Sequence, residues 1–158
     1  MAMGSRREPR VRIDPEKLAA YRAFITAHAE VLTRIERDMA AAGVIPVTWY
    51  DVLIELYEAP ERRLRLHELA RAVVLSRSTL TRTVDRLAAA GLLRREPDPT
   101  DRRGAFAVLT DEGLAAMRRA WPTYAEGINE TVARHMSEDE ARLLTAICER
   151  IRDAARER

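Results

Sequence analysis

Residues 66–86, with the sequence LHELARAVVLSRSTLTRTVDR, constrain the fold more than any other segment of the chain. They are typical of two short helices joined by a tight turn. In the second helix, Leu80, Val84 and Leu87 are spaced i, i+4 and i+7, which predicts one buried face. The rest of its surface carries Ser78, Thr79, Thr81, Arg82, Asp85 and Arg86. Small hydroxyls and arginines suit phosphates and base edges, so the pattern indicates a helix that lies against a nucleic acid.

The segment after this helix predicts a β-hairpin with a basic tip. Gly91 ends the helix, and 92–96 (LLRRE) and 105–109 (AFAVL) are typical of two short strands. The intervening PDPTDRRG, 97–104, contains two prolines and a glycine, which exclude regular structure there. This tip carries Asp98, Asp101, Arg102 and Arg103. The order predicts a winged helix, whose helix enters the major groove of DNA while the arginines reach the adjacent minor groove. The alternative is a structural arm with solvated charges, which the hydroxyl-rich helix before it disfavours.

The region resembles the core of the MarR family (multiple antibiotic resistance regulators). The matching motifs follow one another at short spacing: the ELA helix, the SRSTLTRTVDRL recognition helix, the GLLRRE strand, the DPTDRR wing and the LTDEG start of the next helix. The resemblance in helix count and layout extends from about residue 15 to the end of the chain. It implies a mainly α, six-helix fold with a small β-hairpin wing, that is, a winged helix-turn-helix.

The resemblance also implies a function. Members of this family are obligate homodimers that bind a palindromic operator in double-stranded DNA, and a small phenolic or lipophilic ligand often releases them. Ser76–Arg86 match the family's recognition helix. Asp101 and Arg103 match its wing Asp-x-Arg, in which the arginine enters the minor groove and the aspartate orients it. We therefore expect a sequence-specific DNA-binding regulator of transcription, a repressor that responds to a ligand.

Individual DNA contacts follow from this interpretation. We expect base contacts from Ser78, Thr79, Thr81 and Arg82, phosphate contacts from Ser76, Arg77 and Arg86, and the wing from Asp101, Arg102 and Arg103. The turn at Val73–Leu75 contains no glycine, so the helix can be offset by one residue from the simplest register. Such an offset changes which residues contact individual bases, but it leaves the prediction of a helix-turn-helix intact.

Charge and cysteine content narrow the range of partners. The 158 residues suit one domain, and the net charge is only +2. Positive charge that serves a nucleic acid must therefore be local, and seven arginines do fall between residues 77 and 103. A single cysteine, Cys148, excludes an internal disulfide framework. No secretory signal or membrane-length apolar run is visible, so we expect a cytoplasmic protein.

The flanking segments predict helices with clear start and stop signals. Asp14 precedes a long helix that Gly43 ends, and Pro46 opens a second helix that Pro60 closes. Residues 61–65 form a connector, with a possible short strand that pairs with the wing. Thr110 begins a helix to about residue 135, with a kink or break near 120–121 because of Pro122. Ser137 and Glu140 form a capping box for the last helix. The predicted divisions are a flexible tail (1–13), a dimerisation helix and linker (14–46), a DNA-binding lobe (47–110) and C-terminal dimerisation helices (111–158).

The first and last helices carry apolar stripes that a small winged-helix core does not need. Burial between two subunits explains them, with packing onto the same chain as the alternative. The expected interface residues are Leu18, Leu143, Leu144, Ile147 and Ile151. A twofold dimer would hold two recognition helices about 34 Å apart, one turn of DNA.

Aromatic residues in the first two helices suggest a ligand pocket. By the resemblance, ligands lie between the dimer frame and the DNA-binding lobe, and the candidate residues are Tyr21, Arg22, Phe24, His28, Trp49, Tyr50 and Tyr57. Such a set suits a small aromatic or phenolic effector, with Arg22 as partner for a carboxylate. For any single residue, plain core packing is the alternative.

Other function classes have little support. His28, His67 and His135 lie far apart without metal-ligand spacing, so no metal and no cofactor is expected. Asp51 and Glu55 are spaced i, i+4, but a solvated face explains them, and no nucleophile system indicates an enzyme. Cys148 is interpreted as a packing residue, with a redox sensor as the alternative. The remaining alternative is a winged-helix module that binds proteins and not DNA.

Overall fold

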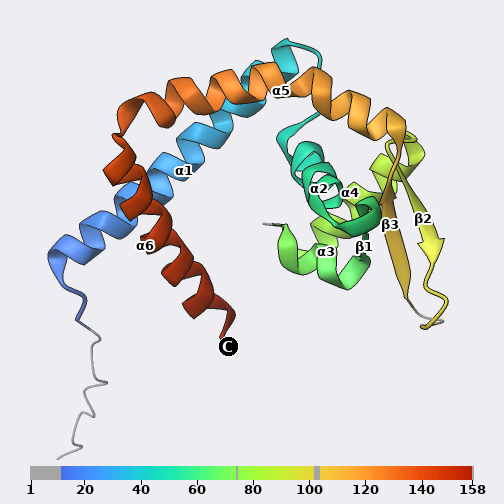
Figure 1. Ribbon diagram of the computed structural model, residues 1–158. Helices are drawn as coiled ribbons and strands as arrows, with labels where there is room; N and C mark the ends of the chain where they lie inside the picture. Colours follow the sequence, from blue (N-terminus) through green and yellow to red (C-terminus); the bar gives the residue numbers. More distant parts are fainter. Residues whose placement is uncertain (1–11, 74, 102–103, 158) are drawn as a thin grey trace, which may run out of the picture.

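The computed structural model describes residues 12–73, 75–101 and 104–157. The chain forms a compact lobe and an arm of long helices that extends away from it (Figure 1). Within the described ranges there are six α-helices and one three-stranded sheet, which is the mainly α winged helix-turn-helix arrangement predicted from the sequence.

The arm consists of α1 (Pro15–Ala41), the far half of α5 (Asp111–Thr131) and α6 (Glu138–Arg156). The carboxylate of Asp14 caps α1 by accepting from the backbone N–H groups of Glu16 (2.9 Å) and Lys17 (3.2 Å). Gly43, with φ of +66°, ends the helix as predicted. A short 3-10 helix (Ala133–His135) separates α5 from α6, so α5 ends slightly earlier than expected.

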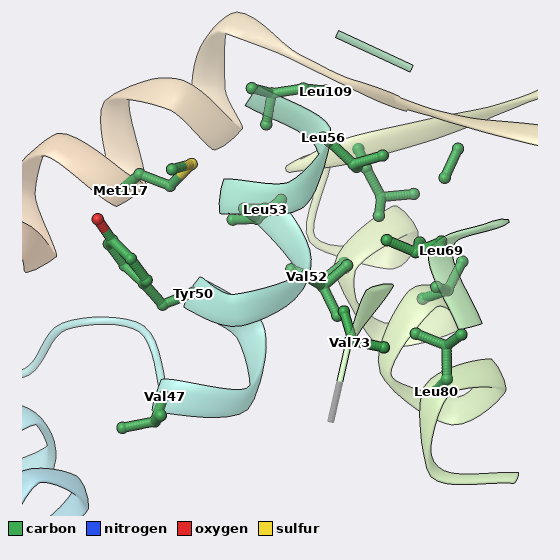
Figure 2. Close-up of a cluster of buried hydrophobic side chains, with 14 of the residues drawn as sticks. Val47, Tyr50, Val52, Leu53, Leu56, Leu69, Val73, Leu80, Leu109 and Met117 are labelled. Carbon is green, nitrogen blue, oxygen red and sulfur yellow. The ribbon is translucent and has the colours of Figure 1, made fainter. Parts of the chain in front are cut away.

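The lobe is built around α2 (Val47–Glu58), whose residues Val52, Leu53 and Leu56 have no exposed surface. The helices α3 (Leu66–Ala72) and α4 (Arg77–Ala89) pack against it. Figure 2 shows Leu69, Val73 and Leu80 gathered on one side of α2, with Met117 of α5 on another. The helix therefore joins the helix-turn-helix to the arm through one continuous core.

The sheet has the order β1-β3-β2 and is antiparallel throughout. The hairpin strands are β2 (Leu93–Pro97) and β3 (Ala105–Leu109), within a residue of the predicted bounds. A short 3-10 helix (Pro60–Arg62) leads into β1 (Arg63–Arg65), which pairs with β3 so that Leu64 lies opposite Ala107. The possible strand in the connector is thus confirmed, and it places the start of α3 beside the hairpin.

The start of α5 is fixed against the end of α4 by the threonine and glycine of the LTDEG motif. The hydroxyl of Thr110 donates to the carbonyl of Gly91 (2.7 Å) and accepts from the N–H of Gly113 (3.0 Å). Gly113 is buried directly against the carbonyl oxygen of Leu92, where a Cβ atom would collide with it. Glycine at this position is therefore required by close packing of the helix on the backbone.

Of the kink or break predicted near residues 120–121, the break does not occur. Pro122 lies inside α5, which remains one helix and curves over α2 (Figure 1). Proline removes one backbone hydrogen bond, but packing on both sides compensates: Ala120 and Gly127 are buried, and Gly127 lies against Ile35 of α1. Tertiary contacts therefore override the local signal.

A half-buried carboxylate lies in the contact between α2 and α5. The hydroxyl of Tyr124 donates to Asp51 at 3.5 Å, and the ring of Tyr124 meets Tyr50 edge-on at 4.7 Å. Burial, with a smaller contribution from Glu55, raises the pKa of Asp51 above its ordinary value. Burial and the nearby Asp51 raise the pKa of Tyr124 to about 12. The charged form of Asp51 is thus disfavoured by the fold.

We predict that Gly113→Ala destabilises the protein strongly. The new methyl group meets the fixed carbonyl of Leu92 and the side chain of Leu109, so the cost falls at the upper end of the overpacking range, about 3 kcal/mol. Urea denaturation measures it. The control is Arg119→Ala on the exposed side of α5, which should change the free energy of unfolding by less than about 0.5 kcal/mol. Equal stability of the two variants would contradict the close approach.

We predict that Asp51→Asn raises the melting temperature at pH 7. Because the folded pKa is raised, native Asp51 binds a proton more readily than the unfolded chain, and stability falls as pH rises through the window between the two pKa values. Above that window the full penalty applies, and asparagine removes it while keeping an acceptor for Tyr124. The gain should shrink as pH is lowered into the window. Glu36→Gln on exposed α1 is the control, and a gain that does not depend on pH would contradict the electrostatic cause.

Candidate nucleic-acid interface

The helix α4 divides into a buried and an exposed face, as the sequence predicted. Leu80, Val84 and Leu87 are 4%, 1% and 0% exposed, so this stripe is firmly in the core. The exposed residues include Ser78, Thr81, Arg82, Asp85 and Arg86, while Thr79 is half-buried. Burial of one stripe fixes the rotation of the helix about its axis, so the hydroxyl and guanidinium groups face outward together.

A cluster of hydroxyls forms the first turn of α4. Ser76 is the N-cap, and its Oγ accepts from the N–H of Thr79 (3.2 Å). It also donates to the hydroxyl of Thr79 (2.8 Å) and lies 3.2 Å from the hydroxyl of Ser78. Ser76 therefore has a structural role at the helix start in addition to the predicted phosphate contact. A helix N-terminus with hydroxyls at its surface favours an anion such as a phosphate.

The arginines near α4 fall into two groups. Arg94 pairs with Glu96 on its own strand (2.9 Å), and Arg95 of β2 pairs with Asp85 of α4 (2.6 Å). The second pair joins the hairpin to the helix. Among the described residues, Arg82 and Arg86 form no ion pair, so their charges face solvent. From the sequence, Asp85 was predicted only to lie on the surface. Its ion pair with Arg95 could not be predicted, because only the fold brings the hairpin next to α4.

The hairpin stands next to α4. A cavity of about 310 Å³ separates the two, with Thr81 on one side and Arg95 and Asp101 on the other. At the start of the hairpin loop, Asp98 has a 1% exposed side chain and bonds to Arg65 at 2.6 Å. The predicted contacts of Arg102 and Arg103, and of the Arg77 side chain, lie outside the described residues. The Arg95–Asp85 ion pair and the shared cavity thus place the hairpin beside α4.

A pocket of about 350 Å³ lies between α2 and α5. Its lining is Tyr50, Ile54, Tyr57, Leu114, Met117, Arg118 and Trp121. Figure 2 shows Tyr50 and Met117 turned toward one another at this junction. The lining is apolar and aromatic apart from the tyrosine hydroxyls and one guanidinium. Among the described residues, Arg118 forms no ion pair.

Only two of the predicted ligand residues, Tyr50 and Tyr57, line this pocket. Trp49 is half-buried against the core instead. The other four, Tyr21, Arg22, Phe24 and His28, lie on the exposed first half of α1. The residues of α5 were missed, although Leu114, Arg118 and Trp121 are spaced i, i+4 and i+7 and share one helix face. That periodicity was the signal that could have found them.

Three of the five predicted interface residues are exposed in this chain. Leu143, Leu144 and Ile151 are 60%, 43% and 51% exposed, and among its described residues α6 has no buried one. Leu18, Ile147 and the free Cys148 are half-buried. On α1, Tyr21 and Ile25 are also large exposed hydrophobic residues. Both terminal helices therefore present apolar surface that their own chain does not fill.

Two properties of the described part of the chain bear on other functions. No cluster of three or more histidine, cysteine, aspartate or glutamate residues there could hold a metal ion. None of its helices is both long and apolar enough to cross a membrane.

Comparison with known proteins finds relatives of this chain in both sequence and fold. The model of the MarR family matches residues 45–104. The regulator MhqR of Bacillus subtilis is 28% identical over 125 residues, which cover 79% of this chain and 83% of MhqR. The MarR family regulator Sco3205 of Streptomyces coelicolor, solved in complex with DNA, is 31% identical over 91% of both chains, with a TM-score of 0.83.

A third relative shares the fold at lower identity. BpsR of Bordetella bronchiseptica is 17% identical, covering 90% of this chain and 99% of BpsR, with a TM-score of 0.76. The matched family segment contains α2, α3, α4 and the first hairpin strand β2, so it includes the helix that carries the exposed hydroxyls and arginines. On the sequence identity, the coverage and the shared fold together, the chain belongs to the MarR family of transcriptional regulators.

Proposed function

We propose that this regulator is a repressor that binds a palindromic operator as a homodimer and is released by a small aromatic acid. The observation that carries the DNA-binding part is the exposed face of α4, where Arg82 and Arg86 stand beside surface hydroxyls. The neighbouring hairpin supports it, and so does the similarity to Sco3205, which was crystallised in complex with DNA.

A homodimer is supported by the two uncovered apolar faces at the chain's ends. The apolar residues Leu143, Leu144 and Ile151 all lie on α6, and an isolated chain would expose them to water. A second copy offers the same surface, which is how a twofold interface becomes self-complementary. The dimer would hold two α4 helices about 34 Å apart, in adjacent major grooves of one operator.

We predict that Arg82→Ala weakens binding to the operator by about 1–3 kcal/mol, roughly 5- to 150-fold, and relaxes its sequence preference. The affinity is measured by fluorescence anisotropy with DNA from the promoter region of the protein's own gene, at several salt concentrations. Random DNA of equal length reports the non-specific part. Arg37→Ala, at an exposed site on α1, is the matched control and should leave both affinities unchanged. An equal loss on operator and random DNA would contradict base reading by Arg82.

The proposal of an effector site is supported by the pocket between α2 and α5. An aromatic ring would be in contact with Tyr50, Tyr57 and Trp121, and Arg118 offers a charge partner for a carboxylate. In BpsR, DNA binding is regulated by 6-hydroxynicotinic acid, which is an aromatic acid. Because α2 belongs to the lobe and α5 continues into the arm, a ligand here would change the angle between them. The spacing of the two α4 helices would then no longer match the operator.

We predict that Arg118→Ala weakens the binding of salicylate or 4-hydroxybenzoate by about tenfold, because one charge-assisted hydrogen bond is lost. Calorimetry measures binding, and anisotropy in the presence of the same acid measures release from DNA. Arg119→Ala, on the next residue of the same helix, is the control. Tight binding of the acids that leaves the operator affinity unchanged would contradict the effector mechanism.

A further inference from the structure

Position 65 carries a residue that is poorly suited to its place in the backbone. Arg65 is the N-cap of α3, where serine, threonine, asparagine or aspartate normally accepts a hydrogen bond from the first turn. A guanidinium has only donors and cannot accept from a backbone N–H. In a capping box the N-cap and N3 side chains each accept from the other residue's backbone N–H, and here only Glu68 does so, from the N–H of Arg65 (2.9 Å). Because the guanidinium takes no part in capping, it is available for other hydrogen bonds.

The guanidinium of Arg65 reaches across to the hairpin. Its Nε donates to Asp98 at 2.6 Å, and one terminal nitrogen donates to the hydroxyl of Thr100 at 3.3 Å. The group also lies over the ring of Phe106, 5.2 Å from its centre. These four residues, Arg65, Asp98, Thr100 and Phe106, are called the loop anchor below. They join the start of the helix-turn-helix to both sides of the hairpin.

Asp98 organises the loop side of the loop anchor. Its second carboxylate oxygen accepts from the N–H (2.9 Å) and the hydroxyl (2.7 Å) of Thr100. The hydrogen bond from Arg65, and then those from Thr100, hold the pKa of Asp98 well below its ordinary value. Its backbone N–H donates to the carbonyl of Gly104 (3.2 Å), so both ends of the loop are tied together. A buried carboxylate with this many donors stays charged and rigidly placed.

The loop tied by Asp98 is the one that carries Arg102 and Arg103 in the sequence. A loop that is anchored before DNA arrives loses less conformational entropy on binding than a free one. The anchor also connects the loop to α3, the helix that precedes the recognition helix. Any contact of the loop with DNA is therefore held in register with α4 by the loop anchor.

We propose that Arg65 is a positioning residue for DNA binding: through Asp98 it fixes the hairpin at the distance from α4 that lets both meet one duplex. Arg65 itself need not touch DNA. The inference rests on the proposed function in one respect, because it assumes that the hairpin loop contacts DNA.

The test separates positioning from simple stabilisation by a double-mutant cycle. The first arm combines Arg65→Ser with Asp98→Asn, which removes the anchor, supplies α3 with a normal cap and leaves no unpaired buried carboxylate. The second arm is Arg103→Ala. Operator affinity, its dependence on salt and the melting temperature are measured for both arms and for the combined variant.

We expect the first arm to lower operator affinity about tenfold and to reduce the salt slope by about 1, as when a phosphate contact is lost, with a small change in melting temperature. In the Arg103→Ala background the same change should cost almost nothing, because the loop then lacks the arginine that the anchor positions. Arg65→Lys, which keeps one charge but cannot bond both Asp98 and Thr100, should fall between wild type and the first arm.

Different failures have different meanings. If the losses from the two arms add, the anchor acts independently of the loop and the positioning role is wrong, while the proposed function stands. If Arg103→Ala alone leaves affinity and salt slope unchanged, the hairpin makes no contact with DNA, and both this inference and that part of the proposed function fail. If the first arm does not fold, Arg65→Lys takes its place in the same cycle, and additivity then overturns the inference.

Discussion

Burial of one stripe of α4 is the constraint on which the other features depend. Leu80, Val84 and Leu87 are held in the core beside α2, and this fixes both the height and the rotation of the helix. Because these three residues are buried, the side chains on the opposite face of α4 must be exposed. That face carries the hydroxyls and arginines, so the packing of the core determines which groups are available for recognition.

The helix α5 links the surface of α4 to the rest of the molecule. The start of α5 is locked to the end of α4 by Thr110 and Gly113, and its later turns pack on α1. One continuous helix therefore runs from the DNA-binding lobe into the arm (Figure 1). Its contact with α2 contains both the aromatic pocket and the half-buried Asp51. Under the proposed function, a ligand at that contact would alter the angle between lobe and arm, and with it the spacing of the two α4 helices in a twofold dimer.

The sequence predicted what depends on local periodicity and caps. The buried and exposed faces of α4 and the starts of α1, α5 and α6 are encoded within a turn or two of each element, at Asp14, Thr110 and Ser137. It could not predict what depends on distant partners. Arg65 and Asp98 are 33 residues apart, and the pocket forms only when α5 crosses α2. For the same reason the sequence predicted a kink or break at Pro122 without deciding between them: packing along α5 outweighs one lost hydrogen bond, and the helix curves without breaking (Figure 1).

The central claim is that the exposed face of α4 reads DNA as one of two copies in a twofold dimer. The most direct test of this claim is to map where α4 meets DNA. In a Cys148→Ser background, an iron chelate tethered at Ser78→Cys cleaves nearby DNA strands, and the same chelate at Arg37→Cys on α1 is the control. We expect cleavage from the first site only, within the major groove, at two positions about 34 Å apart on the operator. Cleavage confined to one half-site, or an equal pattern from both tethers, would contradict it.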